Sequence, residues 1–236
     1  MKFDLHIHSH RSPDSFSRID SILGYAKKRG LSGIALTDHG MIAPDGLESI
    51  ARDNGLWIIR GNEIQTEIGD VLALFLSRPV ESRSAESLIS EIHAQGGVAV
   101  LAHPFKYAQA YPLRIVEKFD AIETVNGRWK DLSLIEDNQK VTQLLSLVRG
   151  RCAGSDAHFA PEVGRAYWET ESLASPEDLK RTIRTGSGQA VCSRYSPWLD
   201  EASQGVKFLK QPSARQLARV MYWTMRRLTF TPRSGL

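Results

Sequence analysis

Histidines and carboxylates recur in short pairs along this chain, and these two side-chain types together bind divalent metal ions. The pairs are a His-x-His, an Asp-His and an Asp-x-His, formed by His6 and His8, Asp38 and His39, and Asp156 and His158. Residues i and i+2 of an extended strand point to the same side, so His6 and His8 can bind a single ion. Because the pattern contains no thiolate, it suits Zn, Mn or Fe.

The candidate ligands outnumber what one ion needs. His103 ends the apolar run VAVLAH, and Glu63 can bridge two ions through its two oxygen atoms. Asp14, in the loop after His8, is a further candidate, whereas His10 could either bind an ion or support a ligand. We therefore expect a cluster of two or three ions, and ions about 3.5–4 Å apart suit phosphoester hydrolysis.

Short β-rich runs alternate with helix-like segments over the first 160 residues. The runs cover residues 3–8, 33–38, 57–63, 71–76, 98–103, 121–125 and 151–156. Apolar residues at helical spacing predict helices at 21–29, 84–95 and 176–184. Residues 65–70 leave no room for a helix between the third and fourth runs, so they suit a hairpin-like junction. This rhythm predicts a parallel α/β fold of seven strands.

The positions of the polar residues distinguish between two such folds. A doubly wound sheet concentrates its site at one switch point, whereas a barrel brings the carboxyl end of every strand to one face. The candidate ligands follow nearly all of the seven runs, which favours the barrel. We expect a barrel domain over residues 1–195 and a basic helical extension, packed on the barrel, over residues 196–236.

Composition excludes several other classes of protein. The chain has 236 residues, of which 42% are hydrophobic and 24% charged, which is ordinary globular usage. No apolar run approaches the roughly 18 residues of a membrane-spanning helix, and the first residues do not read as a signal peptide. Only two cysteines occur, so a disulfide scaffold and a cysteine zinc finger are excluded. We expect a reducing, cytoplasmic compartment.

Positive charge gathers at the end of the chain. From residue 205 onward there are seven lysines or arginines and no acidic residue, whereas residues 1–204 have 23 basic and 27 acidic residues. The spacing predicts a cationic amphipathic helix at 213–228. Such a helix typically packs one face on the body of its protein. The alternative is nucleic-acid binding, with Tyr222 and Trp223 stacking on bases.

Six blocks of sequence resemble the PHP (polymerase and histidinol phosphatase) family. They lie within residues 3–167 in the family's order, and they read DLHIHSHRSPDS, GLSGIALTDHG, GNEIQT, VLAHPFKY, IETVNGR and CAGSDAHFAPEVGRAY. The resemblance implies a distorted seven-stranded (βα)7 barrel with a trinuclear metal site that hydrolyses phosphoesters.

The resemblance also implies how the ligands divide among the ions. The first ion takes His6, His8, Glu63 and Asp156, the second takes Glu63 and His103, and the third takes Asp14, His39 and His158. Asp38 and Asn126 are expected to orient these ligands rather than to bind metal. Many members have a histidine where this chain has Asp70. That carboxylate can bind the second ion, which would shift the preference toward Mn or Mg, or it can turn away and leave two tight ions.

The resemblance implies a mechanism as well. A hydroxide that bridges two ions attacks phosphorus, with Glu63 holding the ions together and Asp156, His158 or Asp14 moving the proton to the leaving oxygen. Three basic residues that follow strand ends are candidates to bind the phosphate, namely Lys106, Arg128 and Arg165.

The leading hypothesis is a phosphatase that acts on a small phosphorylated substrate. A nuclease acting on DNA or RNA ends is an alternative, because the basic tail could bind the nucleic acid. A non-catalytic regulatory module that binds metal is a third possibility, although the nearly complete ligand set speaks against it.

Overall fold

The computed structural model describes residues 1–47, 55–104, 106, 111–129, 138–193 and 198–229. The strands are β1 (Lys2–Ile7), β2 (Gly33–Leu36), β3 (Trp57–Thr66), β4 (Gly69–Leu74), β5 (Val98–Leu101), β6 (Ala121–Asn126), β7 (Gly150–Gly154), β8 (Ala166–Glu169) and β9 (Gln189–Cys192). The α-helices are α1 (Ile19–Lys28), α3 (Ala85–His93), α4 (Leu113–Val116), α5 (Asn138–Leu147), α6 (Pro176–Thr185), α7 (Trp198–Lys210) and α8 (Ala214–Thr229).

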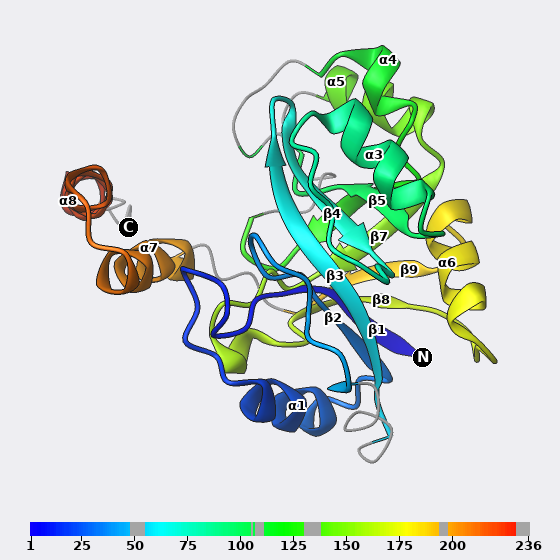
Figure 1. Ribbon diagram of the computed structural model, residues 1–236, viewed down its shortest axis with the longest axis horizontal. Helices are drawn as coiled ribbons and strands as arrows, with labels where there is room; N and C mark the ends of the chain where they lie inside the picture. Colours follow the sequence, from blue (N-terminus) through cyan, green and yellow to red (C-terminus); the bar gives the residue numbers. More distant parts are fainter. Residues whose placement is uncertain (48–54, 105, 107–110, 130–137, 194–197, 230–236) are drawn as a thin grey trace, which may run out of the picture.

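The strands form one mixed sheet that curls into a nearly closed barrel (Figure 1). The order is β7-β6-β5-β4-β3-β2-β1-β8-β9. The ends of the seven-strand part meet where Ile7 pairs in parallel with Ala157, just beyond β7. The Asp4 carboxylate accepts hydrogen bonds from the backbone N–H groups of Ser155 and Gly164 across the same seam. The predicted barrel type is therefore confirmed.

Two details of the sequence prediction need correction. The sheet is not all parallel, because β4 runs antiparallel to both β3 and β5. The cause is the tight turn between Thr66 and Gly69, since a parallel neighbour would need a crossover of a dozen or more residues. The sheet also has more than seven strands, because β8 and β9 extend it antiparallel beyond β1.

Helices cover the outside of the barrel. Helix α3 buries Leu88 and Ile92 in an apolar cluster with alternate residues of β4 and β5, and α1 buries Ile22 in a cluster with Ile34 of β2. Helix α6 begins after Ser175, whose hydroxyl caps it by accepting a hydrogen bond from the Asp178 backbone N–H. The strands are thus buried on both faces, which explains their nearly continuous apolar sequences.

An irregularity in β1 turns its histidines toward the site. Phe3 and Leu5 belong to the apolar cluster that contains Ala35 of β2, but Ile7 belongs to the cluster under α1. The register with β2 shifts between Asp4 and Ile7, so the strand changes the face that its odd-numbered residues occupy. Bulges of this kind commonly re-aim a side chain next to a functional site.

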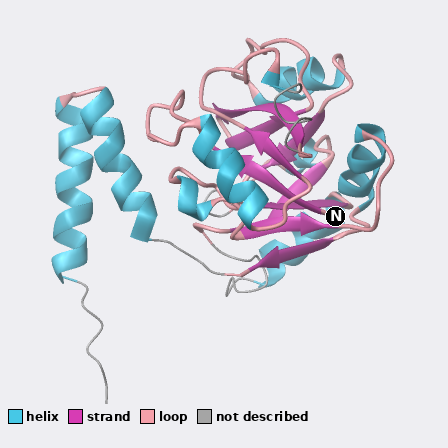
Figure 2. Cartoon of the chain, turned by 90° about the horizontal axis from the view of Figure 1, so that it is seen from below, coloured by secondary structure: helices cyan, strands magenta, loops and turns pink. Residues whose placement is uncertain are grey.

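The last two helices form a hairpin beside the barrel (Figure 2). The predicted helix at 213–228 coincides with α8. Helix α7 comes before it in the chain, and a short turn joins the two helices. The Lys210 ammonium at the end of α7 donates hydrogen bonds to three backbone carbonyls of the loop after β1, those of His10, Ser12 and Ser15. None of the helices in the described ranges has both the length and the apolar composition needed to span a bilayer.

Candidate metal centre

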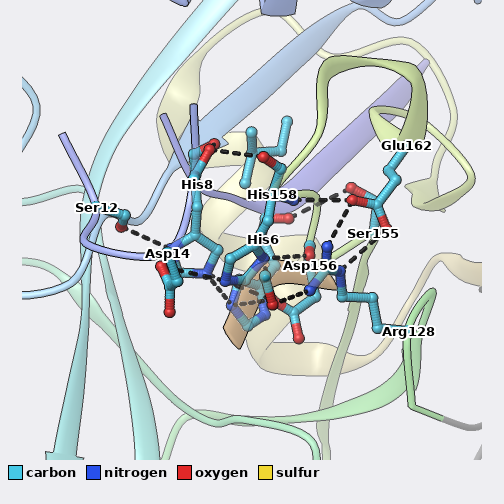
Figure 3. Close-up of polar contacts among 12 residues, drawn as sticks. His6, His8, Ser12, Asp14, Arg128, Ser155, Asp156, His158 and Glu162 are labelled. Atoms are coloured by element: carbon cyan, nitrogen blue, oxygen red, sulfur yellow. Dashed lines mark hydrogen bonds and ion pairs between the residues drawn. The ribbon is translucent and has the colours of Figure 1, made fainter. Parts of the chain in front are cut away.

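The predicted ligands converge at the carboxyl end of the barrel (Figure 3). Three overlapping groups each place their ligand atoms within 4.8 Å of one another, namely His6, Glu63 and His103; His6, His8 and Asp156; and His8, Asp14, His39 and His158. All these residues are buried except His39, which is partly exposed. Side chains from β1, β3 and the loops after β2, β5 and β7 thus line one pocket.

Glu63 lies at the centre of the three groups. Its Oε1 is 3.0 Å from His103 Nε2. Its Oε2 is 3.3 Å from His6 Nε2, 3.1 Å from His8 Nε2 and 3.4 Å from His39 Nδ1. Because the two oxygens face different histidines, this carboxylate can hold two ions at once.

Asp156 and Asp14 complete the arrangement. Asp156 Oδ1 lies 3.5 Å from His6 Nε2 and 3.4 Å from His8 Nε2. The two oxygens of Asp14 lie 3.4 Å from His39 Nε2 and 3.4 Å from His158 Nε2. Asp14 Oδ1 is buried and accepts no hydrogen bond. An unsatisfied buried carboxylate oxygen among imidazoles is what a cation would satisfy, so these residues fit a divalent ion.

The charges of the pocket favour cations. Burial alone would lower the pKa of His6, but Asp156, Glu123 and Glu63 override it and raise that pKa well above its usual value. For His8, burial is likewise overridden by Asp156 and Glu63, which raises its pKa to about 9. Despite burial, the histidines hold the pKa values of Glu63 and Asp156 well below their usual range. The carboxylates therefore stay ionised. Without metal, protons on the imidazoles of His6 and His8 balance the negative charge that a metal ion would otherwise balance.

Backbone strain occurs at two of the ligands. His103 has φ of 24° and Asp156 has φ of 55°, in the region that residues with a side chain rarely adopt. Such strain persists only where the surrounding structure enforces it, and it concentrates at functional sites. It places both side chains toward the pocket just after their strands end.

Sequence reasoning missed the acid that supports His6. Glu123 on β6 is 1% exposed, and its Oε1 lies 3.0 Å from His6 Nδ1, so the Nε2 of His6 faces the pocket. Its Oε2 accepts hydrogen bonds from the backbone of His103 and from the predicted supporting residue Asn126. The signal was an acid in the middle of a short β-rich run, AIETVN. A carboxylate behind a metal-binding histidine fixes its tautomer and orientation.

Four further contacts, made by Ser12 and Asp38, hold the loop after β1. Ser12, which was not predicted, contacts His8 Nδ1 at 3.0 Å and accepts a hydrogen bond from the His39 backbone N–H at 2.9 Å. Asp38 accepts hydrogen bonds from the N–H and hydroxyl of Ser9, at 2.6 and 2.7 Å. The Asp38 carboxylate therefore fixes the segment between His8 and Ser12, rather than the imidazole of its neighbour His39.

The predicted phosphate-binding residues lie in different places. Lys106 lines the cavity above the pocket. Arg128 is buried in a bidentate pair with Glu162, at 2.7 and 3.0 Å, and Glu162 also accepts the backbone N–H of His158. Arg128 therefore braces the loop that carries His158. Arg165 lines a separate hollow with Lys2, so the structure does not bring it together with the ligands.

Two other predicted residues stand at the margin of the site. Asp70 is buried, with Oδ2 3.9 Å from His103 Nε2, but it is outside the three groups. Burial and the neighbouring Glu63 raise the pKa of Asp70. His10 is exposed and also lies outside the groups. His93, the last residue of α3, lies outside the site and pairs with Asp120 at 2.8 Å.

A cavity of about 820 Å³ opens above the ligands. Its floor includes Asp14, Glu63 and Asp156, and its walls include residues of α7 and α8. The volume lies within the range of sites for small molecules, about 300–1,000 Å³.

Comparison with known proteins identifies the family. The sequence model of the PHP domain matches residues 4–174, so the chain belongs to the PHP domain family. An uncharacterized protein of Methanocaldococcus jannaschii is 34% identical over 146 residues, which are 56% of this chain and 85% of that protein. A protein of Syntrophotalea carbinolica named a probable phosphatase is 49% identical over 41 residues, 17% of each chain.

A solved structure shares the fold. It is a two-domain protein of Bacteroides vulgatus, described as containing a predicted PHP-like metal-dependent phosphoesterase. It has a TM-score of 0.65 and 20% identity, and the match covers 89% of this chain and 69% of that one. The resemblance drawn from the sequence motifs is thus confirmed for both family and fold.

Proposed function

We propose that this protein is a metal-dependent hydrolase that acts on a small phosphomonoester. The observation that carries the proposal is the position of Glu63, whose two oxygens lie 3.0–3.4 Å from histidines of different ligand groups. That arrangement suits closely spaced ions, and closely spaced ions suit phosphoester hydrolysis. The names of the relatives support the same class of reaction.

Bound divalent ions supply Lewis acidity toward water and toward the phosphoryl oxygens. The chain itself supplies the rest of the chemistry. Asp156 Oδ1 lies 3.5 Å from His158 Nδ1, and we assign the proton transfer toward the leaving oxygen to His158, because Asp156 stays ionised. Burial, Arg128 and His8 lower the pKa of His158, which keeps this imidazole neutral and able to accept a proton. Lys106 lines the same cavity and can bind a phosphate oxygen of the substrate.

The ligand chemistry favours Zn, Mn or Fe, because imidazole predominates over oxygen in each group. A cavity of about 820 Å³ supports a small substrate rather than a nucleic-acid groove. The nuclease hypothesis rested partly on stacking by Tyr222 and Trp223. Tyr222 is exposed on α8, and the side chain of Trp223 lies outside the described residues.

The test is hydrolysis of p-nitrophenyl phosphate by protein reconstituted with Mn²⁺ or Zn²⁺. We expect turnover that a chelator abolishes, and we expect His6→Ala to lower kcat/KM by at least about a hundredfold, since losing only a group that supports a ligand costs 10–100-fold. His93→Ala, which removes a histidine outside the site, is the matched control and keeps its rate. Metal-loaded protein that hydrolyses no phosphoester in a broad panel would instead indicate the regulatory module.

A further inference from the structure

Part of the wall of this cavity is cationic. Lys207 of α7 and Arg215 of α8 line it, together with Arg83 from the segment before α3. The two helices lie beyond residues 4–174, which match the family, so this part of the wall belongs to the extension of this chain. The floor, in contrast, carries the carboxylates of Asp14, Glu63 and Asp156.

Within the described part of the chain, no carboxylate pairs with Lys207 or Arg215 of this wall. No acidic residue follows Glu201 in the sequence. Gln204 and Gln216 line the same wall, and each has a buried amide oxygen without a hydrogen-bond partner. Cations that pair with no carboxylate of the described residues suit an anionic group, and the two amide oxygens suit a hydrogen-bond donor, such as a hydroxyl, on the same ligand.

The hairpin that carries these residues is fixed to the barrel next to the ligands. Lys210 is bound to three carbonyls of the loop that also carries Asp14. On the other side, Arg128 donates a hydrogen bond to the Ser203 hydroxyl of α7 at 3.0 Å. The same Arg128 pairs with Glu162, which holds the loop of His158. The cationic wall is therefore held in place over the pocket.

We infer that Lys207, Arg215 and Arg83 form a subsite for a second anionic group of the substrate. The inference rests on the proposed function, in which the phosphate that reacts binds at the pocket floor. Once the reacting phosphate binds the ions, a second anion on the same substrate needs another source of positive charge. Lys207, Arg215 and Arg83 line the same cavity and supply that charge. The preferred substrate is thus a small phosphoester whose leaving group carries its own phosphate or carboxylate.

The test measures binding rather than turnover, so it does not depend on catalysis. The probes are propane-1,3-diylbisphosphonate and propylphosphonate, which resist hydrolysis and differ only in the second anion. Calorimetry on Mn²⁺-reconstituted protein is expected to show at least about tenfold tighter binding of the bisphosphonate, as two charge-assisted contacts can supply. In Lys207→Gln/Arg215→Gln the two probes are expected to bind within about twofold of each other.

The matched control is Arg18→Gln/Lys28→Gln, which removes two cations at the ends of α1, outside the cavity. It is expected to keep the wild-type preference, and thermal melts check that both double variants fold. Equal binding of the two probes by the wild type would overturn the inference. So would a preference that survives in Lys207→Gln/Arg215→Gln, because the metal ions alone would then explain it. Tight bisphosphonate binding without any phosphoester turnover would contradict only the proposed function.

Discussion

The Glu123 carboxylate touches no predicted ion position, yet it determines how His6 is oriented. It binds His6 Nδ1 and the His103 backbone at once, so it links two of the candidate ligands. Glu123→Gln keeps the shape but removes the charge, and we expect metal affinity to fall by about 10–100-fold. Competition with a chelator measures this loss. Glu177→Gln, at an exposed acid of α6, is the control, and equal affinities of the two variants would contradict the role assigned to Glu123.

The histidine protons give a pH prediction. In metal-free protein the pKa of His8 is raised to about 9 from a usual 6.5, so its protonated form stabilises the fold. That contribution is complete below pH 6.5 and is lost as the pH rises through about 9. It amounts to about 3 kcal/mol at most. Urea unfolding with a chelator present should therefore show falling stability between pH 6.5 and 9.

Added Mn²⁺ should have the opposite dependence over the same range. The metal requires neutral imidazoles, so the stabilisation by a fixed Mn²⁺ concentration should increase with pH. A metal-free stability that stays level or rises from pH 6.5 to 9 would show that His8 is not paired with Glu63 and Asp156 as described.

At the level of residues, ligands could be predicted from sequence because short pairs such as His6 and His8 follow strand ends. The residues that support these ligands could not be predicted, because Glu123 and His6 are 117 positions apart in the sequence and meet only in the folded barrel. The same limit applies to Arg128. As an arginine it is a candidate to bind phosphate, but in the structure it is buried and pairs with Glu162. Long-range pairs of this kind leave no local spacing to recognise.

Among the elements, the closure of the barrel depends on a glycine. A Cβ atom on Gly154 of β7 would lie 2.4 Å from the Cβ of His6 and 2.6 Å from its backbone nitrogen. We expect Gly154→Ala to destabilise the protein by about 2–3 kcal/mol or more, because β1 and β7 must separate. Gly24→Ala in α1 has open space around it and should stabilise by up to about 1 kcal/mol. Urea unfolding compares the two, and a neutral Gly154→Ala would refute the close approach.

Helix α7 should loosen when Lys210 is replaced. Lys210→Met removes the hydrogen bonds to the carbonyls of the loop after β1, and we expect a loss of about 1 kcal/mol because the group is partly solvated. Hydrogen exchange should accelerate in α7 and in residues 10–15. Lys118→Met, at an exposed ion pair with Glu86, is the control. Unchanged exchange in Lys210→Met would show that these bonds do not hold the helix.

The order of strands and helices could largely be predicted, because burial on both faces gives each strand a short apolar run. The short connection predicts the hairpin at Thr66–Gly69. Strands joined by such a hairpin run antiparallel, so the expectation of an all-parallel sheet is wrong at β4. Strands β8 and β9 were missed because they are four residues each and lie where the alternation weakens.

In the whole molecule, all the acidic residues among the described ones that line the cavity belong to the barrel, whereas the extension adds only cations and neutral polar side chains to it. Sequence gave no sign that Lys207 and Arg215 would line the same cavity as Glu63. That proximity arises from how the α7–α8 hairpin packs beside the barrel. It joins the extension to the metal centre as part of one candidate active site.

The most direct test of the metal centre is an anomalous difference map from crystals grown with Mn²⁺. The three ligand groups predict peaks beside Glu63, with one between His6 and His103, one between His6, His8 and Asp156, and one among Asp14, His39 and His158. At least two peaks within coordination distance of Glu63 are expected. A map with no peak in this pocket, at a Mn²⁺ concentration that saturates the protein in solution, would contradict the account.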